Sequence, residues 1–376
     1  MKILHLIYSQ QVAGAEKYLL DILPGLKQKG IDCSLVCVIP VNDSHKFTEF
    51  CRELNSKGVP TEIFNGSTSS LLSVARRIND HLKKNEIKYI HAHLFKADML
   101  AVLIKKLFNK RMVILSTKHG YDEAYFNKHP LNPGKIDHNI YYFISKFVNA
   151  NIDAQVTTSK AMSDLYYNLK LTTTRIPYIH HGIDLAIPAE TGDCRLADPQ
   201  LIIVGRIEKI KGHIYLFEAM PEVIKKFPGV KLLILGNGKE KQQLEDKAAA
   251  LGITDNIKFM GFQPNPAGYI TSSDIIIQPS LYESFGLIYI EAFALKVPVI
   301  AFDVQAGNEI ISNNETGILV PVFNTAALAE KIIFLLENPL ERERIFGNAY
   351  KRYCEYFNTA RMITETIAWY NSLVFP

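Results

Sequence analysis

The chain has 376 residues, which exceeds the size at which one hydrophobic core keeps growing, so two domains of similar size are expected. Its 48% hydrophobic and 21% charged residues are ordinary for a globular enzyme, and a net charge of +4 is too small to indicate nucleic-acid binding by itself. The five scattered cysteines contain no Cys-x-x-Cys spacing, which argues against a zinc site or a disulfide framework.

No apolar run approaches the roughly 20 residues that a membrane-spanning helix needs. The amino terminus runs directly into a strand-like segment and lacks the pattern of a signal peptide. We therefore expect a cytoplasmic protein with reduced cysteines.

Short buried strands alternate with helices through the first half of the chain. Lys2 to Tyr8 predicts a strand, and Gly14 to Lys29 predicts an amphipathic helix. Further strands are predicted at Ile31 to Ile39, Thr61 to Phe64, Lys88 to His93, Met112 to Thr117, Ile152 to Thr158 and Arg175 to Ile179. Such alternation indicates a doubly wound parallel sheet, whose ligand groups collect at the carboxyl ends of the strands.

Glycine and histidine stand at several of these strand ends. Gly14 lets the backbone approach a phosphate, or it merely lets a helix and a strand pack closely, and the segment alone does not decide. His91, His93, His119 and His181 recur at predicted strand ends, where a satisfied structural histidine is the simpler interpretation of any one of them. Because no carboxylate or cysteine joins them at ligand spacing, no metal site is predicted.

Two stretches of the first half suggest binding surfaces. From Arg76 to Lys118, eleven basic residues stand against three acids and alternate with apolar residues. This pattern is typical either of a face that contacts an anionic membrane or of an ordinary solvated helix surface. The long aromatic stretch from Tyr121 to Tyr142 is interrupted by prolines and is typical of a binding loop.

A Pro-, Gly- and acid-rich segment from Asp184 to Gln200 predicts a linker, which divides the chain into domains at residues 1–184 and 201–356 with the linker at 185–200. A second alternating series follows. Its strands are predicted at Leu201 to Val204, Val230 to Leu235 and Ile257 to Met260, and its helices at His213 to Lys226 and Lys239 to Leu251.

The loop from Gly205 to Gly212 holds Arg206 and Lys211 between glycines. A loop cannot bury cations cheaply, and a diphosphate would account for them, because arginine grips two oxygens in a fork and lysine adds a point charge. Gly236 and Gly238 end the next strand without a third glycine at Gly-x-Gly-x-x-Gly spacing, which counts against a nicotinamide cofactor.

One βαβ unit follows from Asp274 to Ala301. It is predicted to contain a strand at Ile275 to Ile277, a helix at Phe285 to Leu295 and a strand at Val297 to Ala301. The amides of Phe285, Gly286 and Leu287 at the start of the helix can meet an anion. Two carboxylates, Glu283 and Glu291, bracket this turn with seven residues between them.

The string Pro-Ser-x-x-Glu-Ser-Phe-Gly-Leu around Glu283, with Glu-x7-Glu spacing and Gly-Arg-x-x-x-x-Lys-Gly upstream, resembles the signature of the family 4 retaining glycosyltransferases. The resemblance implies an α/β fold of the GT-B type, with two Rossmann-like, doubly wound parallel-sheet domains that face each other across a cleft. It also implies that the last helix, within residues 357–376, crosses back to the first domain.

The resemblance implies transfer of a sugar from a nucleotide diphosphate sugar, linked to UDP in preference to GDP, with no cofactor and no metal. The acceptor would be a glycan or a lipid-linked molecule in cell-envelope polysaccharide or lipopolysaccharide biosynthesis. No Asp-x-Asp motif of metal-dependent glycosyltransferases is present. Acceptor recognition is placed in the loop from Tyr121 to Tyr142, and the basic stretch suggests peripheral contact with an anionic membrane.

Roles for individual residues follow from the same resemblance. Glu283 would face the transferred sugar, Glu291 the ribose, and His119, in Thr-Lys-His-Gly, the donor sugar, while Arg206 and Lys211 would hold the phosphates. The remaining donor contacts are expected from residues that lie in the predicted loops: Gly14, Gly205, Gly236, Gly261, Ser284, Phe285, Gly286 and Leu287.

Three alternatives stay open. A nucleotide-sugar epimerase of the same broad fold would turn over the donor without an acceptor. A phosphorylase would carry a lysine-bound pyridoxal phosphate. A non-catalytic sugar-nucleotide binding protein would bind the donor and release no nucleoside diphosphate. Fold alone does not separate these functions.

Overall fold

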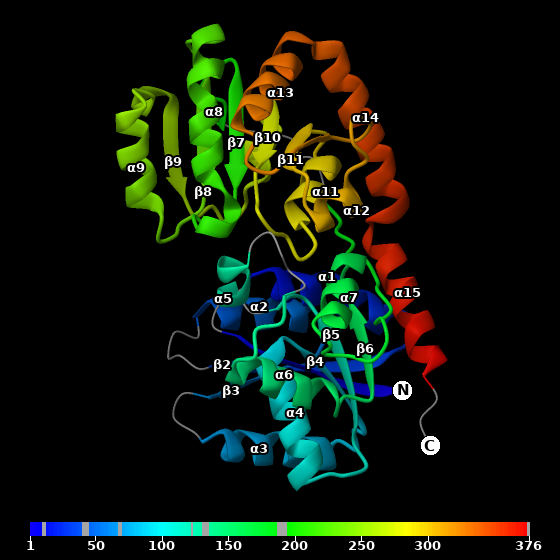
Figure 1. The fold of residues 1–376 in the computed structure, drawn as a ribbon. Helices are drawn as coiled ribbons and strands as arrows, with labels where there is room; N and C mark the ends of the chain where they lie inside the picture. The colour runs from blue at the N-terminus through cyan, green and yellow to red at the C-terminus, as the bar shows by residue number, and fades with distance from the viewer. Residues whose placement is uncertain are drawn as a thin grey trace. The chain divides into compact units, whose positions relative to one another are not determined.

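The computed structural model describes residues 1–9, 13–39, 45–66, 70–121, 123–129, 135–185 and 194–373, and the chain divides into two compact units (Figure 1). Unit 1 contains Met1–Asp122, Gly134–Gly182 and Asn358–Pro376, and unit 2 contains Glu123–Pro133 and Ile183–Phe357. The predicted linker falls largely on residues 186–193, which lie outside the described residues, so its boundaries stay a prediction.

Unit 1 is built on a parallel sheet with the strand order β3-β2-β1-β4-β5-β6. Its strands are β1 (Lys2–Tyr8), β2 (Asp32–Ile39), β3 (Thr61–Asn65), β4 (Tyr89–His93), β5 (Val113–Lys118) and β6 (Ala154–Thr157). Its helices are α1 (Gly14–Gln28), α2 (His45–Ser56), α3 (Leu71–Lys84), α4 (Phe95–Leu107), α6 (Ile140–Asn149), α7 (Lys160–Asn168) and α15 (Thr359–Ser372).

Helices cover both faces of this sheet because side chains alternate along each strand. Ile3 and Ile7 of β1 belong to a core cluster with α1, α2 and α15, whereas Leu4 and Leu6 belong to a cluster with α3, α4 and α6. Helix α15 packs against α1 at Gly25, where a Cβ would lie 2.1 Å from Cδ1 of Ile363.

The predicted strand from Arg175 to Ile179 is wrong. This segment makes a single bridge, between Thr157 of β6 and Tyr178. Pro177 has no amide N–H to give to a ladder, and its carbonyl instead accepts from the Thr157 amide at 3.0 Å.

Unit 2 repeats the plan with the strand order β12-β11-β10-β7-β8-β9. Its strands are β7 (Gln200–Val204), β8 (Lys231–Leu235), β9 (Ile257–Gly261), β10 (Ile275–Gln278), β11 (Val299–Phe302) and β12 (Ile318–Val320). Its helices are α5 (Glu123–Lys128), η2 (Lys209–Lys211), α8 (His213–Lys226), α9 (Lys241–Ala250), η3 (Thr254–Asn256), α10 (Ala267–Thr271), α11 (Leu287–Ala294), α12 (Gln305–Ile310), α13 (Thr325–Glu337) and α14 (Pro339–Tyr356).

Helix α11 begins at Leu287, two residues later than predicted. Gly286 precedes the helix in a left-handed conformation with φ of 98°, so it and Phe285 belong to the loop. The following strand, β11, begins at Val299, after Pro298, which cannot donate to a ladder.

In both sheets the first strand of the unit lies in the interior of the strand order. β1 is flanked by β2 and β4, and β7 is flanked by β8 and β10. At such a reversal of strand order the loops leave toward opposite faces of the sheet, and a crevice forms beyond the carboxyl ends of the strands. Each unit therefore has one place where a ligand site is expected.

None of the described helices combines the length and the apolar character needed to cross a membrane.

Candidate active site

The carboxyl ends of β7 and β10 bring a lysine and a glutamate together in unit 2. Lys211 ends η2, which follows β7, and Glu283 lies in the loop that follows β10. Lys211 Nζ lies 2.7 Å from Glu283 Oε1, and the two side chains are 18% and 9% exposed. Adjacent parallel strands end at the same edge of the sheet, which places both loops at the reversal of strand order.

Two further polar residues hold the Glu283 carboxylate. Ser280 Oγ donates to Glu283 Oε1 at 2.8 Å, and Gln278 Nε2 donates to Ser280 Oγ at 3.3 Å. Neither residue is predicted from the sequence to have a role. The available signal was a Pro-Ser pair and a buried glutamine directly after a strand of three isoleucines, at an edge where a βαβ unit collects ligand groups.

Glycines join the loops of unit 2 to one another, among them Gly205, Gly236 and Gly261, which were predicted to bind the donor. A Cβ on Gly236 would lie 1.8 Å from the Gly205 carbonyl oxygen, and a Cβ on Gly212 would lie 1.9 Å from the Pro279 carbonyl oxygen. The Gly236 amide donates to the Gly261 carbonyl at 2.8 Å. These glycines let backbones touch, and their contact with a donor stays a prediction.

The start of α11 offers backbone amides beside Glu283. Only glycine fits at position 286, because a Cβ would lie 2.4 Å from the Tyr289 ring and because φ is positive. Among the described residues, the amides of Gly286 and Leu287 donate to no other group. An uncapped helix start of this kind attracts an anion.

The other predicted residues of this loop and helix have mixed surroundings. The Phe285 ring is buried and faces Phe357, with ring centroids 6.2 Å apart, so this side chain belongs to the core. Ser284 and Glu291 are half-buried. Tyr289 is fully buried, and burial, followed by the charge of Glu283, holds the pKa of its hydroxyl well above the usual value. Arg206 is exposed on the loop that leads from β7 to Lys211.

Helix α5 contributes an aromatic contact next to Glu283. The Phe126 ring stacks on the Tyr282 ring with centroids 3.5 Å apart and planes 16° from parallel. Burial raises the pKa of the Tyr282 hydroxyl above its usual value. The aromatic stretch predicted as a binding loop therefore reaches the Glu283 loop within unit 2, although residues 122 and 130–134 of that stretch lie outside the described residues.

Histidines gather in unit 1 along the central strands and at their carboxyl ends. His5 of β1 and His91 and His93 of β4 are buried, and His119 follows β5. His5 Nδ1 lies 3.0 Å from His93 Nε2, and His93 Nδ1 lies 3.1 Å from His119 Nε2. His181 Nε2 instead lies 3.0 Å from Asp21 Oδ2. His5 is not predicted from the sequence as a site residue, because it stands in the middle of a strand.

Ligand nitrogens of His5, His91 and His93 all lie within 4.8 Å of one another. Hydrogen bonds already engage both nitrogens of His91, since Nδ1 lies 2.6 Å from the Tyr370 hydroxyl and Nε2 lies 2.8 Å from Thr117 Oγ1. The three histidines therefore fit a hydrogen-bonded cluster better than a set of ligands for a cation.

Gly14 opens α1 at the edge where β1 ends. Its neighbour Ala13 donates its amide to the Glu16 carboxylate at 2.8 Å, and Glu16 is almost completely buried. The predicted phosphate contact of Gly14 stays a prediction.

Comparisons with known proteins agree with this architecture. The family described as Glycosyltransferase Family 4 matches residues 12–187, and Glycosyl transferases group 1 matches residues 194–352. Among solved structures, Anabaena HepE in complex with UDP-glucose superposes with a TM-score of 0.82 at 18% identity, covering 99% of this chain and 100% of that one. Sucrose-phosphate synthase from Thermosynechococcus elongatus superposes with a TM-score of 0.80 at 20% identity, over 99% and 98% of the two chains.

Curated relatives are glycosyltransferases as well. The phosphatidyl-myo-inositol mannosyltransferase of Mycobacterium tuberculosis is 27% identical over 94% of this chain and 93% of its own length. Alpha-D-kanosaminyltransferase of Streptomyces kanamyceticus is 33% identical, but the match spans only 40% of either chain. A mannosyltransferase of Mycobacterium leprae is 37% identical over 42% of either chain.

Two Rossmann-like units with ligand sites at their strand-order reversals define the GT-B fold. The match of the first half to the Glycosyltransferase Family 4 model and of the second half to the Glycosyl transferases group 1 model, together with the named relatives, makes the protein a glycosyltransferase of this fold.

Buried histidines predict a loss of stability in mild acid. Burial lowers the pKa of His5, His119 and His213 from 6.5 to about 3. The unfolded chain binds protons below pH 6.5 while the folded chain does not, so stability is complete above pH 6.5 and falls as the pH decreases toward 3. At pH 5 each such histidine costs on the order of 2 kcal/mol.

Urea denaturation at pH 7.5, 6 and 5 measures this effect. His5→Phe should flatten the pH dependence by about one proton, whereas His138→Gln, at an exposed position, should leave it unchanged. Equal free energies of unfolding at pH 7.5 and pH 5 would contradict the prediction.

Proposed function

We propose that the protein is a retaining, metal-independent glycosyltransferase that moves a sugar from a nucleotide diphosphate sugar to a glycan or lipid-linked acceptor. The observation that carries this proposal is the Lys211–Glu283 pair at the strand-order reversal of unit 2, fixed by Ser280 and adjoining the amides of α11. Cation, carboxylate and amides meet where a diphosphate and its sugar would lie.

Charge development explains why these groups suit the reaction. As the bond between C1 and the phosphate oxygen breaks, negative charge grows on the leaving diphosphate and positive charge grows on the sugar ring. Lys211, Arg206 and the Gly286 and Leu287 amides would stabilise the diphosphate, while the Glu283 carboxylate would stand beside the sugar. Groups already in position stabilise the transition state more than the ground state.

The expected stereochemistry is retention, in which the leaving phosphate serves as the base for an acceptor that attacks from the same face. Glu283 accepts from Lys211 and Ser280, an arrangement suited to an electrostatic role rather than to a covalent nucleophile. Glu291, one turn into α11, would hold the ribose of the donor. The Glu-x7-Glu spacing thus divides sugar and ribose recognition between a loop and a helix.

Metal independence is supported by the charges of the chain itself. The loop from Gly205 to Gly212 supplies cations, and the sequence has no Asp-x-Asp. For the carrier we propose UDP in preference to GDP, since the structural neighbour HepE was solved with UDP and UDP-glucose. An acceptor built on a lipid accords with the name of the mycobacterial relatives and with envelope polysaccharide synthesis.

Replacing either member of the central pair should abolish most turnover. Glu283→Gln and Lys211→Met should each lower kcat for release of nucleoside diphosphate by about 10²–10³-fold, the range for loss of one preorganised charge-stabilising group. Excess EDTA should leave the wild-type rate unchanged. Coupled release of nucleoside diphosphate from a panel of UDP- and GDP-sugars, with and without acceptor, measures both effects.

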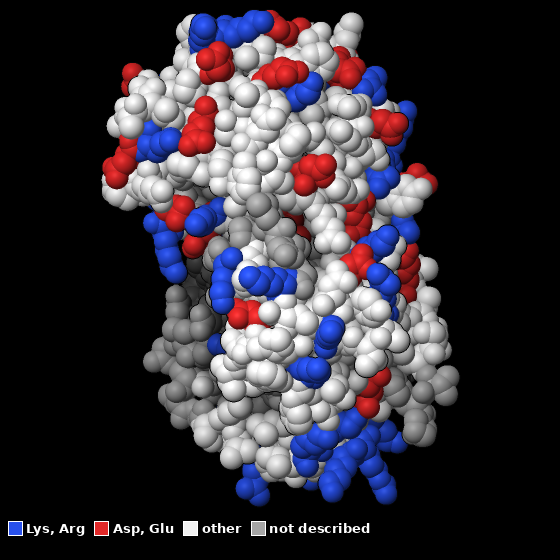
Figure 2. Space-filling model, in the orientation of Figure 1, with Lys and Arg blue, Asp and Glu red and all other residues white. Residues whose placement is uncertain are grey.

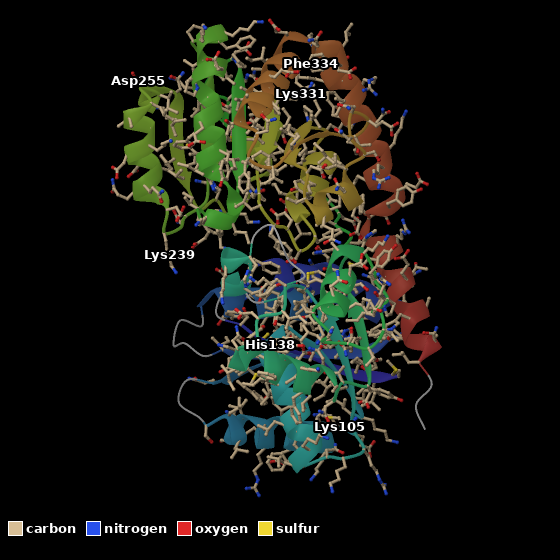
Figure 3. All side chains as sticks on the ribbon, viewed as in Figure 1. Lys105, His138, Lys239, Asp255, Lys331 and Phe334 are labelled. Carbon is tan, nitrogen blue, oxygen red and sulfur yellow. The ribbon has the colours of Figure 1, made fainter. Side chains whose placement is uncertain are left out.

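The exposed pair Glu330 and Lys331 on α13 supplies matched controls, and Lys331 is visible in Figure 3. Glu330→Gln and Lys331→Met should keep wild-type rates. Donor conversion that needs no acceptor would favour an epimerase. Donor binding without any release, unaffected by Glu283→Gln, would favour a non-catalytic binding protein, and loss of activity with EDTA would refute metal independence.

Acceptor recognition is proposed for α5 and the loop around it. Phe126 covers Tyr282, the residue before Glu283, so a molecule bound along α5 would approach the reacting sugar. Phe126→Ala should raise the acceptor KM by about tenfold, because a buried aromatic contact is lost, and should leave the donor KM within about twofold. Phe334→Ala, a partly exposed phenylalanine on α13, is the control (Figure 3). An unchanged acceptor KM would remove α5 from acceptor recognition.

We further propose that unit 1 contacts an anionic membrane through α6. Ile140, Phe143 and Phe147 are 76%, 54% and 58% exposed on one stripe of this helix. Within the basic stretch from Arg76 to Lys118, Lys118 and Asp98 form a buried ion pair, which leaves ten basic residues against two acids. Figure 2 shows Lys and Arg gathered at the lower end of unit 1, in the region where Figure 3 labels Lys105 of α4.

Vesicle sedimentation tests this contact. Burying each phenylalanine in lipid contributes about 1.5–3 kcal/mol, and each basic residue near anionic lipid adds about 1 kcal/mol. Phe143→Ser with Phe147→Ser should abolish binding to vesicles that contain phosphatidylglycerol, whereas Leu340→Ser, at a residue 80% exposed on α14, should not. Equal sedimentation of the two variants with vesicles would contradict the proposal. So would a phenylalanine variant that still binds vesicles but no longer associates with itself.

A further inference from the structure

Three histidines of unit 1 form a continuous chain of ring nitrogens from the core to the surface. His5 is buried on β1, His93 is buried on the neighbouring strand β4, and His119 is partly exposed after β5. The planes of the His5 and His93 rings are 15° from parallel, and their centroids are 5.3 Å apart. That separation is too large for face-to-face stacking and fits an in-plane N–H···N hydrogen bond at the 3.0 Å separation of the nitrogens.

Packing holds each ring of this chain in place. Tyr18 of α1 presents its ring edge-on to His119, with centroids 4.8 Å apart. His91 lies beside His93 with centroids 4.6 Å apart and is itself fixed by Tyr370 and Thr117. Because the rings cannot turn freely, the positions of the protons decide what His119 presents to a ligand.

Only two arrangements of protons satisfy both hydrogen bonds between neutral rings. In the first, His5 Nδ1–H donates to His93 Nε2, His93 Nδ1–H donates to His119 Nε2, and His119 keeps its proton on Nδ1. In the second, every bond is reversed, and His119 Nδ1 becomes an acceptor. Each neutral imidazole has one donor and one acceptor, so no mixed arrangement forms both bonds.

The buried end of the chain selects between the two. His5 Nε2 is buried and has no hydrogen-bond partner among the described residues. The first arrangement leaves an unpaired acceptor there, whereas the second leaves an unpaired N–H, and among backbone groups an orphaned buried N–H is rarer than an under-satisfied acceptor. We apply the same preference to the imidazole.

Ionisation does not disturb the chain near neutral pH. Burial holds the pKa of His93 well below 6.5 and lowers the pKa of His5 and of His119 to about 3. All three rings are therefore neutral near neutral pH. The first and second arrangements of protons remain the only ones that form both hydrogen bonds.

We infer that His93 and His5 are positioning residues that fix His119 as the neutral tautomer with its proton on Nδ1, so that His119 offers one N–H donor to an oxygen atom of the bound sugar. This inference rests on the proposed function and on the role that the family resemblance implies for His119, a contact with the donor sugar. Among the described residues, His119 Nδ1 has no hydrogen-bond partner, and it is the nitrogen that remains for a ligand.

Ring-nitrogen NMR of the wild-type protein labelled with ¹⁵N-histidine tests the tautomer directly, with His119→Gln used to assign the signal. The expected result is a proton on His119 Nδ1, unchanged between pH 5 and 8. A proton on Nε2 would overturn the inference whether or not any donor is turned over. Absence of turnover with every donor would instead refute the proposed function and leave the tautomer measurement standing.

Two substitutions of His93 test the consequence for sugar recognition. His93→Leu removes the donor to His119, allows both tautomers, and should lower kcat/KM for the donor about tenfold while binding of free nucleoside diphosphate stays unchanged. His93→Asn can place an amide N–H where Nδ1–H was and should restore most of the rate. His138→Asn, an exposed position that Figure 3 labels, is the control.

Wild-type kcat/KM in His93→Leu, or equal losses in His93→Leu and His93→Asn, would contradict a positioning role. If His93→Leu does not fold, the tautomer of wild-type His119 still decides the question.

Discussion

The reversal of strand order in each parallel sheet is the constraint on which the rest of the structure depends. At β1 and β4 in unit 1, and at β7 and β10 in unit 2, neighbouring strands end side by side while their loops leave toward opposite faces. Polar side chains that are distant in sequence thereby meet at one edge. Lys211 and Glu283 meet in this way, and so do His93 and His119, while His5 joins His93 from the middle of β1.

The two edges differ in chemistry. The edge of unit 2 carries charge, with an ion pair that is mostly shielded from water and backbone amides that start a helix. The histidines at the edge of unit 1 are neutral at physiological pH, because burial disfavours the charged form of each imidazole. A charged surface suits a diphosphate, whereas neutral donors with fixed direction suit the hydroxyl oxygens of a sugar.

Glycines make the charged edge possible. Gly212 and Gly236 each permit a contact between backbones that any side chain would prevent. The loops that present Lys211 and Glu283 are therefore braced by neighbouring loops rather than held by a ligand. Preorganisation of this kind reduces the reorganisation needed at the moment of reaction, which is the source of electrostatic catalysis.

The sequence by itself determined the alternation of strands and helices, the parallel class of the sheets and the residues of the cationic loop and of the Glu283 turn. Hydrophobic period and turn chemistry are local properties, and they can be read along the chain. The boundaries at Gly286 and Pro177 were missed because left-handed conformation and ladder hydrogen bonds depend on partners.

Only the tertiary structure decided that Ser280 and Lys211 share one oxygen of Glu283, that His5 joins His93, and that Phe126 covers Tyr282. These contacts join residues through strand order and long-range packing, which no local period encodes.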